Sequence, residues 1–180
     1  MTGTYNSALV FLSILVACFA SYTALDLARR IGTLATARYR RYWLGGGAFA
    51  LGIGIWSMHF IGMLAFSMPI PLGYDFLLTL LSLLIAIAVS LLVLQTVSGT
   101  QLSTSRLAVS SIFMGAAIAL MHYTGMAAMR MAPGITYVPW IFIASILIAI
   151  AVSFVALWIA FTLRRYGQRH PLLRQLAAAP

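Results

Sequence analysis

The chain has 180 residues, of which 63% are hydrophobic and 7% are charged, and its mean hydropathy is +1.02. A soluble domain carries about 25% charged residues, so this composition excludes a soluble globular domain. The same hydrophobicity excludes a disordered chain. The net charge of +9 comes from eleven arginines against two aspartates. In a membrane protein such an excess reports topology first, and we expect no nucleic-acid partner.

Five apolar runs are long enough to cross a bilayer as helices, given about 1.5 Å of rise per residue and about 30 Å of hydrocarbon. These runs cover roughly residues 8–28, 43–66, 76–97, 107–129 and 138–163. Most of the charged and turn-forming residues lie between the runs. The sequence therefore predicts an all-α membrane protein with five transmembrane helices, whose main partner is the lipid bilayer.

The arginines fall almost entirely on one side of these predicted spans. On one side lie Arg29, Arg30, Arg38, Arg40, Arg41, Arg106, Arg164, Arg165, Arg169 and Arg174, and on the other only Arg130. The positive-inside rule then predicts that the N-terminus is outside and the C-terminus inside. The basic cluster follows the first helix instead of preceding it, which is the reverse of a signal peptide, so this helix is predicted to be retained.

The chain contains an internal duplication with a period of 63 residues. Residues 53–66 read IGIWSMHFIGMLAF and residues 116–129 read AAIALMHYTGMAAM, while IAIAVS occurs at 85–90 and again at 148–153. Because one period contains two membrane crossings, the copies have the same orientation and form tandem parallel helix-pair repeats. A third motif is expected at about position 185. We interpret residues 171–179 as the start of a sixth helix and the chain as truncated before that motif.

The duplicated motif places a histidine inside two predicted spans, where an ionisable group is costly and marks function by default. Each histidine follows a methionine and precedes another by four residues, a spacing that puts two side chains on one helix face. A glycine three residues after each histidine allows a close approach. The candidate ligands are His59, His122, Met58, Met63, Met121 and Met126, and the candidate close-approach positions are Gly62 and Gly125.

Thioether and imidazole form a soft ligand set that suits Cu(I), and a mixed set can hold Cu(II). Hard cations prefer several carboxylate oxygens, and Asp75 is the one acid expected on that side. Copper is therefore the predicted cofactor. Tyr123 and Asp75 are candidates for supporting the ligands, and Asp75 has an N-cap as its alternative role. We expect Asp26 to pair with neighbouring arginines, and the single Cys18 excludes an intramolecular disulfide.

The residues leave other interpretations open. Methionines in membrane helices usually serve packing, and two histidines on neighbouring helices could instead be the axial ligands of a haem. A metal transporter is a further alternative, although it would need a polar path through the span. An enzyme is not predicted, because the sequence contains no nucleophile–base pair, carboxylate pair or phosphate-binding loop.

The segments MHFIGM at 58–63, MHYTGM at 121–126 and SYTALDLARR at 21–30 resemble the MHYT family of bacterial integral-membrane sensor domains. The resemblance implies a location in the bacterial inner membrane, with a periplasmic N-terminus and a cytoplasmic C-terminus. It implies copper bound by the motif methionines and histidines, and sensing of a diatomic gas (O2, CO or NO) or of redox state.

The same resemblance implies that the full-length protein carries a cytoplasmic output domain, a diguanylate cyclase or phosphodiesterase acting on cyclic di-GMP. This chain departs from the family pattern at Phe60, which stands where the motif has tyrosine. The expected third motif copy and the output domain are not part of the sequence. A homodimer is left open.

Overall fold

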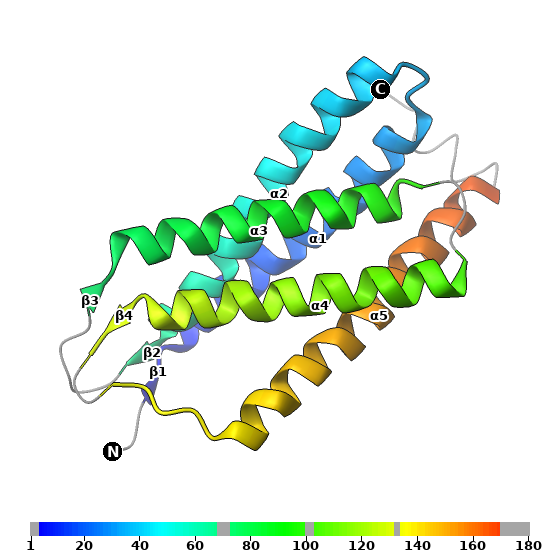
Figure 1. Ribbon diagram of the computed structural model, residues 1–180. Helices are drawn as coiled ribbons and strands as arrows, with labels where there is room; N and C mark the ends of the chain where they lie inside the picture. Colours follow the sequence, from blue (N-terminus) through cyan, green and yellow to red (C-terminus); the bar gives the residue numbers. More distant parts are fainter. Residues whose placement is uncertain (1–3, 68–72, 100–102, 132–133, 170–180) are drawn as a thin grey trace.

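The computed structural model describes residues 4–67, 73–99, 103–131 and 134–169 (Figure 1). The sequence predicts the start of a sixth helix at residues 171–179, and these lie outside the described residues.

Five long helices follow one another up and down the bundle (Figure 1). They are α1 (Ser7–Thr33), α2 (Ala37–Ala65), α3 (Phe76–Val97), α4 (Thr104–Ala127) and α5 (Pro139–Arg169). Each contains a stretch long and apolar enough to cross a membrane, which confirms the predicted fold class. The main difference from the prediction is that α1, α2 and α5 continue past the apolar runs, into the arginine-rich segments. Arginine and alanine favour helix, so the backbone stays helical beyond the end of the apolar run.

Four two-residue strands gather at one end of the bundle and were not predicted. They are β1 (Thr4–Tyr5), β2 (Phe66–Ser67), β3 (Gly73–Tyr74) and β4 (Met129–Arg130). β1 pairs with β2 and β3 with β4, both antiparallel. The pairs tie α1 to α2 and α3 to α4 as two helical hairpins. We call this end of the bundle the strand end and the opposite end the arginine end.

The two hairpins are built on one plan. The N–H of Asn6 donates to the carbonyl of Ala65 at 2.8 Å, and the N–H of Asp75 donates to the carbonyl of Ala128 at 2.7 Å. Asn6 and Asp75 are also the N-caps of α1 and α3, where their side-chain oxygens accept backbone N–H groups. The repeat predicted from the motif helices therefore extends in three dimensions to α1, whose sequence had shown it only weakly.

Two glycines at equivalent repeat positions set the helix spacing. A Cβ atom on Gly52 of α2 would lie 2.6 Å from the Cα of Ile87 in α3. A Cβ atom on Gly115 of α4 would lie 2.4 Å from the Cα of Ile150 in α5. Both distances are far below ordinary contact, so only glycine allows these backbones to meet. The tight helix pairs α2–α3 and α4–α5 thus recur with the sequence period.

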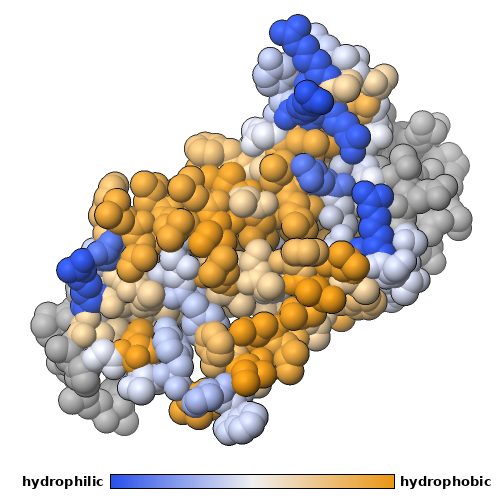
Figure 2. Space-filling model, viewed as in Figure 1, coloured by the Kyte–Doolittle hydropathy of each residue, from blue (hydrophilic) through white to orange (hydrophobic). Residues whose placement is uncertain are grey.

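The interior of the bundle combines large apolar side chains, such as Leu94 and Leu157, with small and polar ones, while many other large apolar side chains point outward. Ser82, Ser90, Ser111 and Ser153 are almost fully buried. Several of these hydroxyls bond a backbone carbonyl of their own helix; Ser90, for example, donates to the carbonyl of Ala86 at 2.8 Å. Figure 2 shows a broad hydrophobic band between hydrophilic groups at the two ends. Exposed apolar side chains over this band, with serines buried between the helices, suit a protein whose surroundings are lipid.

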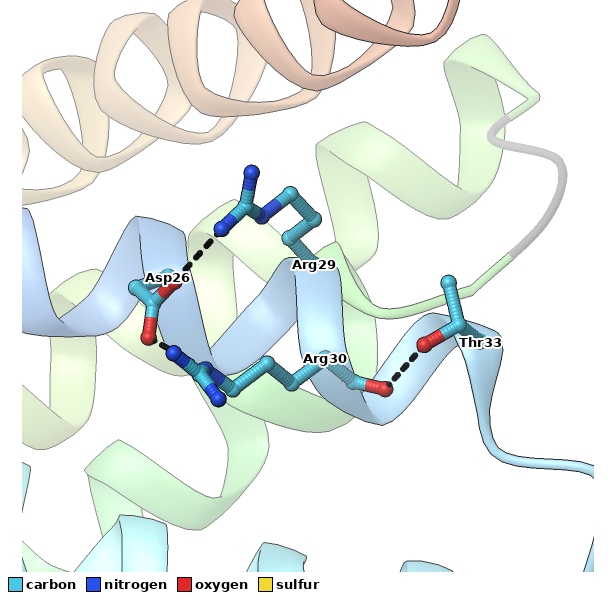
Figure 3. A network of polar contacts seen from close by, with 4 residues as sticks. All are labelled: Asp26, Arg29, Arg30 and Thr33. Carbon is cyan, nitrogen blue, oxygen red and sulfur yellow. Dashed lines mark hydrogen bonds and ion pairs between the residues drawn. The ribbon is translucent and has the colours of Figure 1, made fainter. Parts of the chain in front are cut away.

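At the arginine end, Asp26 of α1 forms the ion pairs that its neighbours predicted (Figure 3). Its carboxylate accepts from Arg29 Nη2 at 3.0 Å and from Arg30 Nε at 2.6 Å. Asp26 does not end the helix, because α1 continues to Thr33, whose hydroxyl donates to the carbonyl of Arg30 at 2.8 Å. All four residues lie on one helix, so this network neutralises the acid locally and joins no second element.

Candidate metal centre

The two motif histidines meet in the interior near the strand end. His59 lies six residues before the end of α2 at Ala65, and His122 lies five residues before the end of α4 at Ala127. Their ring centroids are 4.9 Å apart, with an interplanar angle of 69°. Residues 63 positions apart in the sequence are thereby brought into one site. One side chain comes from each repeat.

Gly125, the glycine that follows His122 by three residues, makes this approach possible. A Cβ atom on Gly125 would lie 3.3 Å from His59 Nε2 and 3.6 Å from His59 Cδ2. The equivalent Gly62 faces a different neighbour, because its Cβ would meet only Ser13 Oγ, at 3.6 Å. The two glycines are therefore not interchangeable: Gly125 shapes the histidine pair, and Gly62 shapes the contact between α1 and α2.

The Nε2 atom of His59 is buried and has no hydrogen-bond partner among the described residues. A buried polar atom without a partner costs about 1–3 kcal/mol, and such an atom in a native structure calls for an explanation. A neutral imidazole nitrogen is also the form in which histidine binds a metal. The atom is aimed at the contact with α4, on the side where His122 and Gly125 lie.

Two motif methionines flank each histidine in the sequence, and the four differ in burial. Met121 is 4% exposed, and the other three, Met58, Met63 and Met126, are half-buried. Met63 and Met126 follow the histidines by four residues and so lie on the same helix faces. The Met58 carbonyl accepts a hydrogen bond from Ser13 Oγ at 2.9 Å, which anchors this turn of α2 to α1.

The donor set of the site fits a soft metal and not a hard one. No group of three or more histidine, cysteine or acidic side chains with the spacing of a metal site occurs within the described residues. A metal held by the two histidines must therefore take its further ligands from other atoms, and the i+4 spacing puts the thioethers of Met63 and Met126 on the histidine faces of α2 and α4. Imidazole with thioether is a combination that copper accepts. The unpartnered nitrogen of His59 is consistent with such a ligand.

Aromatic side chains enclose the histidine pair. The ring of Tyr123 stands 5.1 Å from that of His122, edge to face, and its hydroxyl is hydrogen-bonded to Ser145 on α5. Phe60, at the equivalent position in the first repeat, packs against Trp56 and Tyr74, with ring centroids 4.4 Å and 5.9 Å away. The phenol of Tyr123 thus ties the His122 side of the site to α5. In the first repeat Phe60 has no hydroxyl, and Ser82, the equivalent of Ser145, is instead bonded by Trp56.

Asp75 is engaged in structural interactions at the strand end. Its Oδ1 accepts the N–H of Leu78 at 3.1 Å, which confirms the predicted N-cap of α3. Its Oδ2 pairs with the guanidinium of Arg130 in β4. The Arg130 guanidinium, followed by the Leu78 N–H, holds the pKa of this carboxyl below its ordinary value. The contacts described for Asp75 include none with a candidate metal ligand.

Sequence reasoning missed one polar contact of the motif helix. The indole N–H of Trp56 donates to Ser82 Oγ at 3.0 Å and ties α2 to α3 below the histidines. Ser82 in turn donates to the carbonyl of Thr79 at 2.7 Å. Ser82 has a counterpart in Ser145, but Trp56 aligns with Ala119 in the second repeat. The repeat therefore held no signal for this bond.

The fold and the site together define a multi-pass helical membrane protein, in which a duplicated hairpin brings one histidine from each copy into a shared site. The chain belongs to the MHYT family: the family profile, described as the bacterial signalling protein N-terminal repeat, matches residues 52–110 and 115–172. The start positions differ by the same 63 residues as the motif. The predicted resemblance is confirmed.

Curated relatives are longer signalling proteins. The chain is 56% identical over 178 residues to the bifunctional diguanylate cyclase/cyclic di-GMP phosphodiesterase MucR of Pseudomonas aeruginosa, covering 99% of this chain and 26% of that protein. It is 45% identical over 160 residues to the signaling protein YkoW of Bacillus subtilis (89% and 20%). It is 44% identical over 176 residues to the cyclic di-GMP phosphodiesterase NbdA of Pseudomonas aeruginosa (97% and 22%). The chain thus spans about a quarter or less of these relatives. No solved structure matches it.

Proposed function

We propose that this chain is a membrane sensor module that binds copper between the two repeats at the strand end. The observation that carries the proposal is the histidine pair, with ring centroids 4.9 Å apart and a buried His59 Nε2 that no described residue satisfies. His59 and His122 would hold the metal, with thioether donors drawn from the methionines of the two motifs. When bound, copper would supply a redox-active centre that can take a diatomic ligand such as O2, CO or NO.

The geometry favours copper over haem, the alternative that the sequence left open. Two axial imidazoles must stand on opposite sides of the porphyrin plane, which needs a wide slot between the helices. Here the two rings are in contact, and the backbone of Gly125 closes against His59. A single small ion between side chains requires far less movement of α2 and α4 than a macrocycle does.

We propose that the signal leaves the site through the helix pairs. His59 is on α2 and His122 on α4, and each helix is locked to its successor by a glycine contact, at Gly52 and at Gly115. A change in the spacing of the two histidines would therefore move α2 with α3 against α4 with α5. Such a switch requires two packing states to which the ligand binds with different affinity.

The arginine distribution supports a topology with the strand end in the periplasm and the arginine end in the cytoplasm of the inner membrane. MucR and NbdA are named for cyclic di-GMP synthesis or hydrolysis. By analogy, we propose that the full-length protein carries such an output domain on the cytoplasmic side and that the module regulates it. The bundle itself would be the sensory part and not the catalyst.

Elemental analysis of the purified membrane protein tests the metal proposal. Wild type is expected to retain copper after dialysis, and the His59→Ala, His122→Ala double variant is expected to lose it. Met114→Leu is the matched control, because Met114 is a buried methionine of α4 that lies in the core and outside the motif. Equal copper in wild type and the double variant rejects the proposed ligands. A strong Soret band with stoichiometric iron favours haem.

The regulatory proposal needs the full-length protein in cells. The double histidine variant is expected to abolish the change in cyclic di-GMP level that follows a change in oxygen or nitric oxide supply, while leaving the amount of protein in the membrane unchanged. A response that persists in the double variant would contradict sensing at this site, even if copper binding itself is lost.

A further inference from the structure

A groove with a volume of about 470 Å³ runs between α1 and α2 towards the arginine end. Its walls are Thr23 and Leu27 from α1 and Tyr42, Trp43, Gly46 and Gly47 from α2. Gly46 leaves the groove open, because a Cβ atom there would meet nothing within 4 Å. Gly47 lies against Leu27 and forms part of the floor, because a Cβ atom on Gly47 would lie 3.2 Å from Leu27 Cδ1. The volume is within the roughly 300–1,000 Å³ of small-molecule pockets.

Positive charge stands where this groove meets the arginine end. Arg38, Tyr42 and Gly46 are spaced by four residues, so they form one row along the face of α2. Arg41 directly precedes Tyr42 in the chain, and both arginines are exposed. The largely apolar wall that α2 gives the groove thus continues, along the same helix face, to the guanidinium group of Arg38.

These arginines have no acid of the chain to pair with. The sequence contains only two acidic residues, Asp26 and Asp75. Asp26 is paired with Arg29 and Arg30, and Asp75 is paired at the strand end. In the part of the chain that the structure describes, Arg38 and Arg41 form no ion pair. Their charge is therefore available to an anion from outside the protein.

The aromatic residues at the groove fix its depth in the bilayer. Tyr42 is 66% exposed and Trp43 is 41% exposed. Exposed tyrosine and tryptophan on membrane helices gather at the headgroup level, where one end of the ring is in lipid and the other in water. The row on α2 therefore passes from the headgroup layer at Arg38 into the hydrocarbon at Gly46.

We propose that this groove binds one anionic phospholipid of the bilayer, with its phosphate held by Arg38 and Arg41 and an acyl chain lying over Gly46. Charge complementarity selects this occupant, because basic pockets between transmembrane helices are suited to anionic headgroups. The site is remote from the histidine pair and does not depend on the metal proposal. It would make the packing of α1 on α2 sensitive to the charge of the surrounding lipid.

Native mass spectrometry of the whole chain, with phosphatidylglycerol or phosphatidylcholine of identical acyl chains, tests the proposal. Wild type is expected to prefer phosphatidylglycerol by at least about fivefold, the contribution expected of one arginine at a lipid surface. Arg38→Gln should lower this preference by about fivefold, and Arg106→Gln, at an exposed arginine at the start of α4, should keep it. Equal preference in these two variants overturns the headgroup assignment.

Filling the groove tests the acyl-chain part. Gly46→Leu is expected to weaken binding of both lipids, whereas Gly45→Leu is the matched control, since Gly45 also faces open space but does not line the groove. Gly46→Ala provides a milder version if the larger side chain lowers expression. The proposal is overturned if Gly46→Leu and Gly45→Leu bind lipid equally. It is also overturned if only Gly46→Leu changes the ratio of monomer to dimer, because the groove is then covered by a second copy.

Discussion

Replacing Gly115 by alanine should force α4 and α5 apart. The added methyl group would lie 2.4 Å from Ile150 Cα and 2.6 Å from Ile150 N, whereas carbon atoms pack at about 3.5–4.0 Å. The two backbones must therefore separate by roughly 1 Å. Overpacking costs about 1–3 kcal/mol, and we expect the upper half of that range because backbone atoms cannot rotate away. Alanine favours helix over glycine by about 1 kcal/mol, which leaves a net loss of about 1–2 kcal/mol.

The free energy of unfolding of the detergent-solubilised protein, measured by titration with sodium dodecyl sulfate and followed by circular dichroism, provides the assay. Gly52→Ala should behave like Gly115→Ala, because its methyl group would meet Ile87 Cα at 2.6 Å. Gly46→Ala is the control: its methyl group meets nothing within 4 Å, so it should be neutral or stabilising by up to about 1 kcal/mol. If Gly115→Ala is as stable as Gly46→Ala, the close helix contact is refuted.

Three further predictions follow from individual contacts. Gly125→Ala places a methyl group 3.3 Å from Nε2 of the α2 histidine and should weaken copper binding about tenfold in a competition titration, whereas Gly62→Ala should leave it unchanged; equal effects would contradict the asymmetry of the two glycines. Asp75→Asn should lower the unfolding temperature at pH 7 but not in strong acid, because the pKa of Asp75 is lowered in the folded protein and its contribution is lost as the pH falls through that value; an acid-independent difference would argue against the ion pair. In the same detergent titration, Trp56→Phe should cost about 0.6 kcal/mol more unfolding free energy in wild type than in a Ser82→Ala background, where the bond at 3.0 Å is already lost; equal costs in the two backgrounds would argue against the bond.

The positions of the helices could be predicted because membrane helices must bury an apolar run of fixed length. The predicted run 76–97 and helix α3 coincide. The prediction was least accurate where a run ends in arginines, between α1 and α2 and at the end of α5, because hydropathy measures what the lipid tolerates and not where the backbone stops being helical. The paired strands at the strand end left no pattern, since two residues are too few to show an alternation.

The candidate site was predictable as far as the duplication reaches. A period with two crossings places His59 and His122 at the same end of the bundle, and the motif identifies them without any structure. Their contact at 4.9 Å could not be predicted, because it depends on the packing of α2 and α4 around Gly125. The pairing of Asp75 with Arg130 was also hidden, since the equivalent residues of the first hairpin, Asn6 and Ser67, are uncharged.

The central claim is that the two repeats contribute one histidine each to a single copper site. The most direct test is a copper titration of wild type, His59→Ala and His122→Ala, with the stoichiometry of tight binding as the readout. We expect a single tightly bound copper per chain in wild type and its loss in either single variant. Two coppers per wild-type chain, with each variant losing one and keeping the other, would contradict a site shared between the repeats.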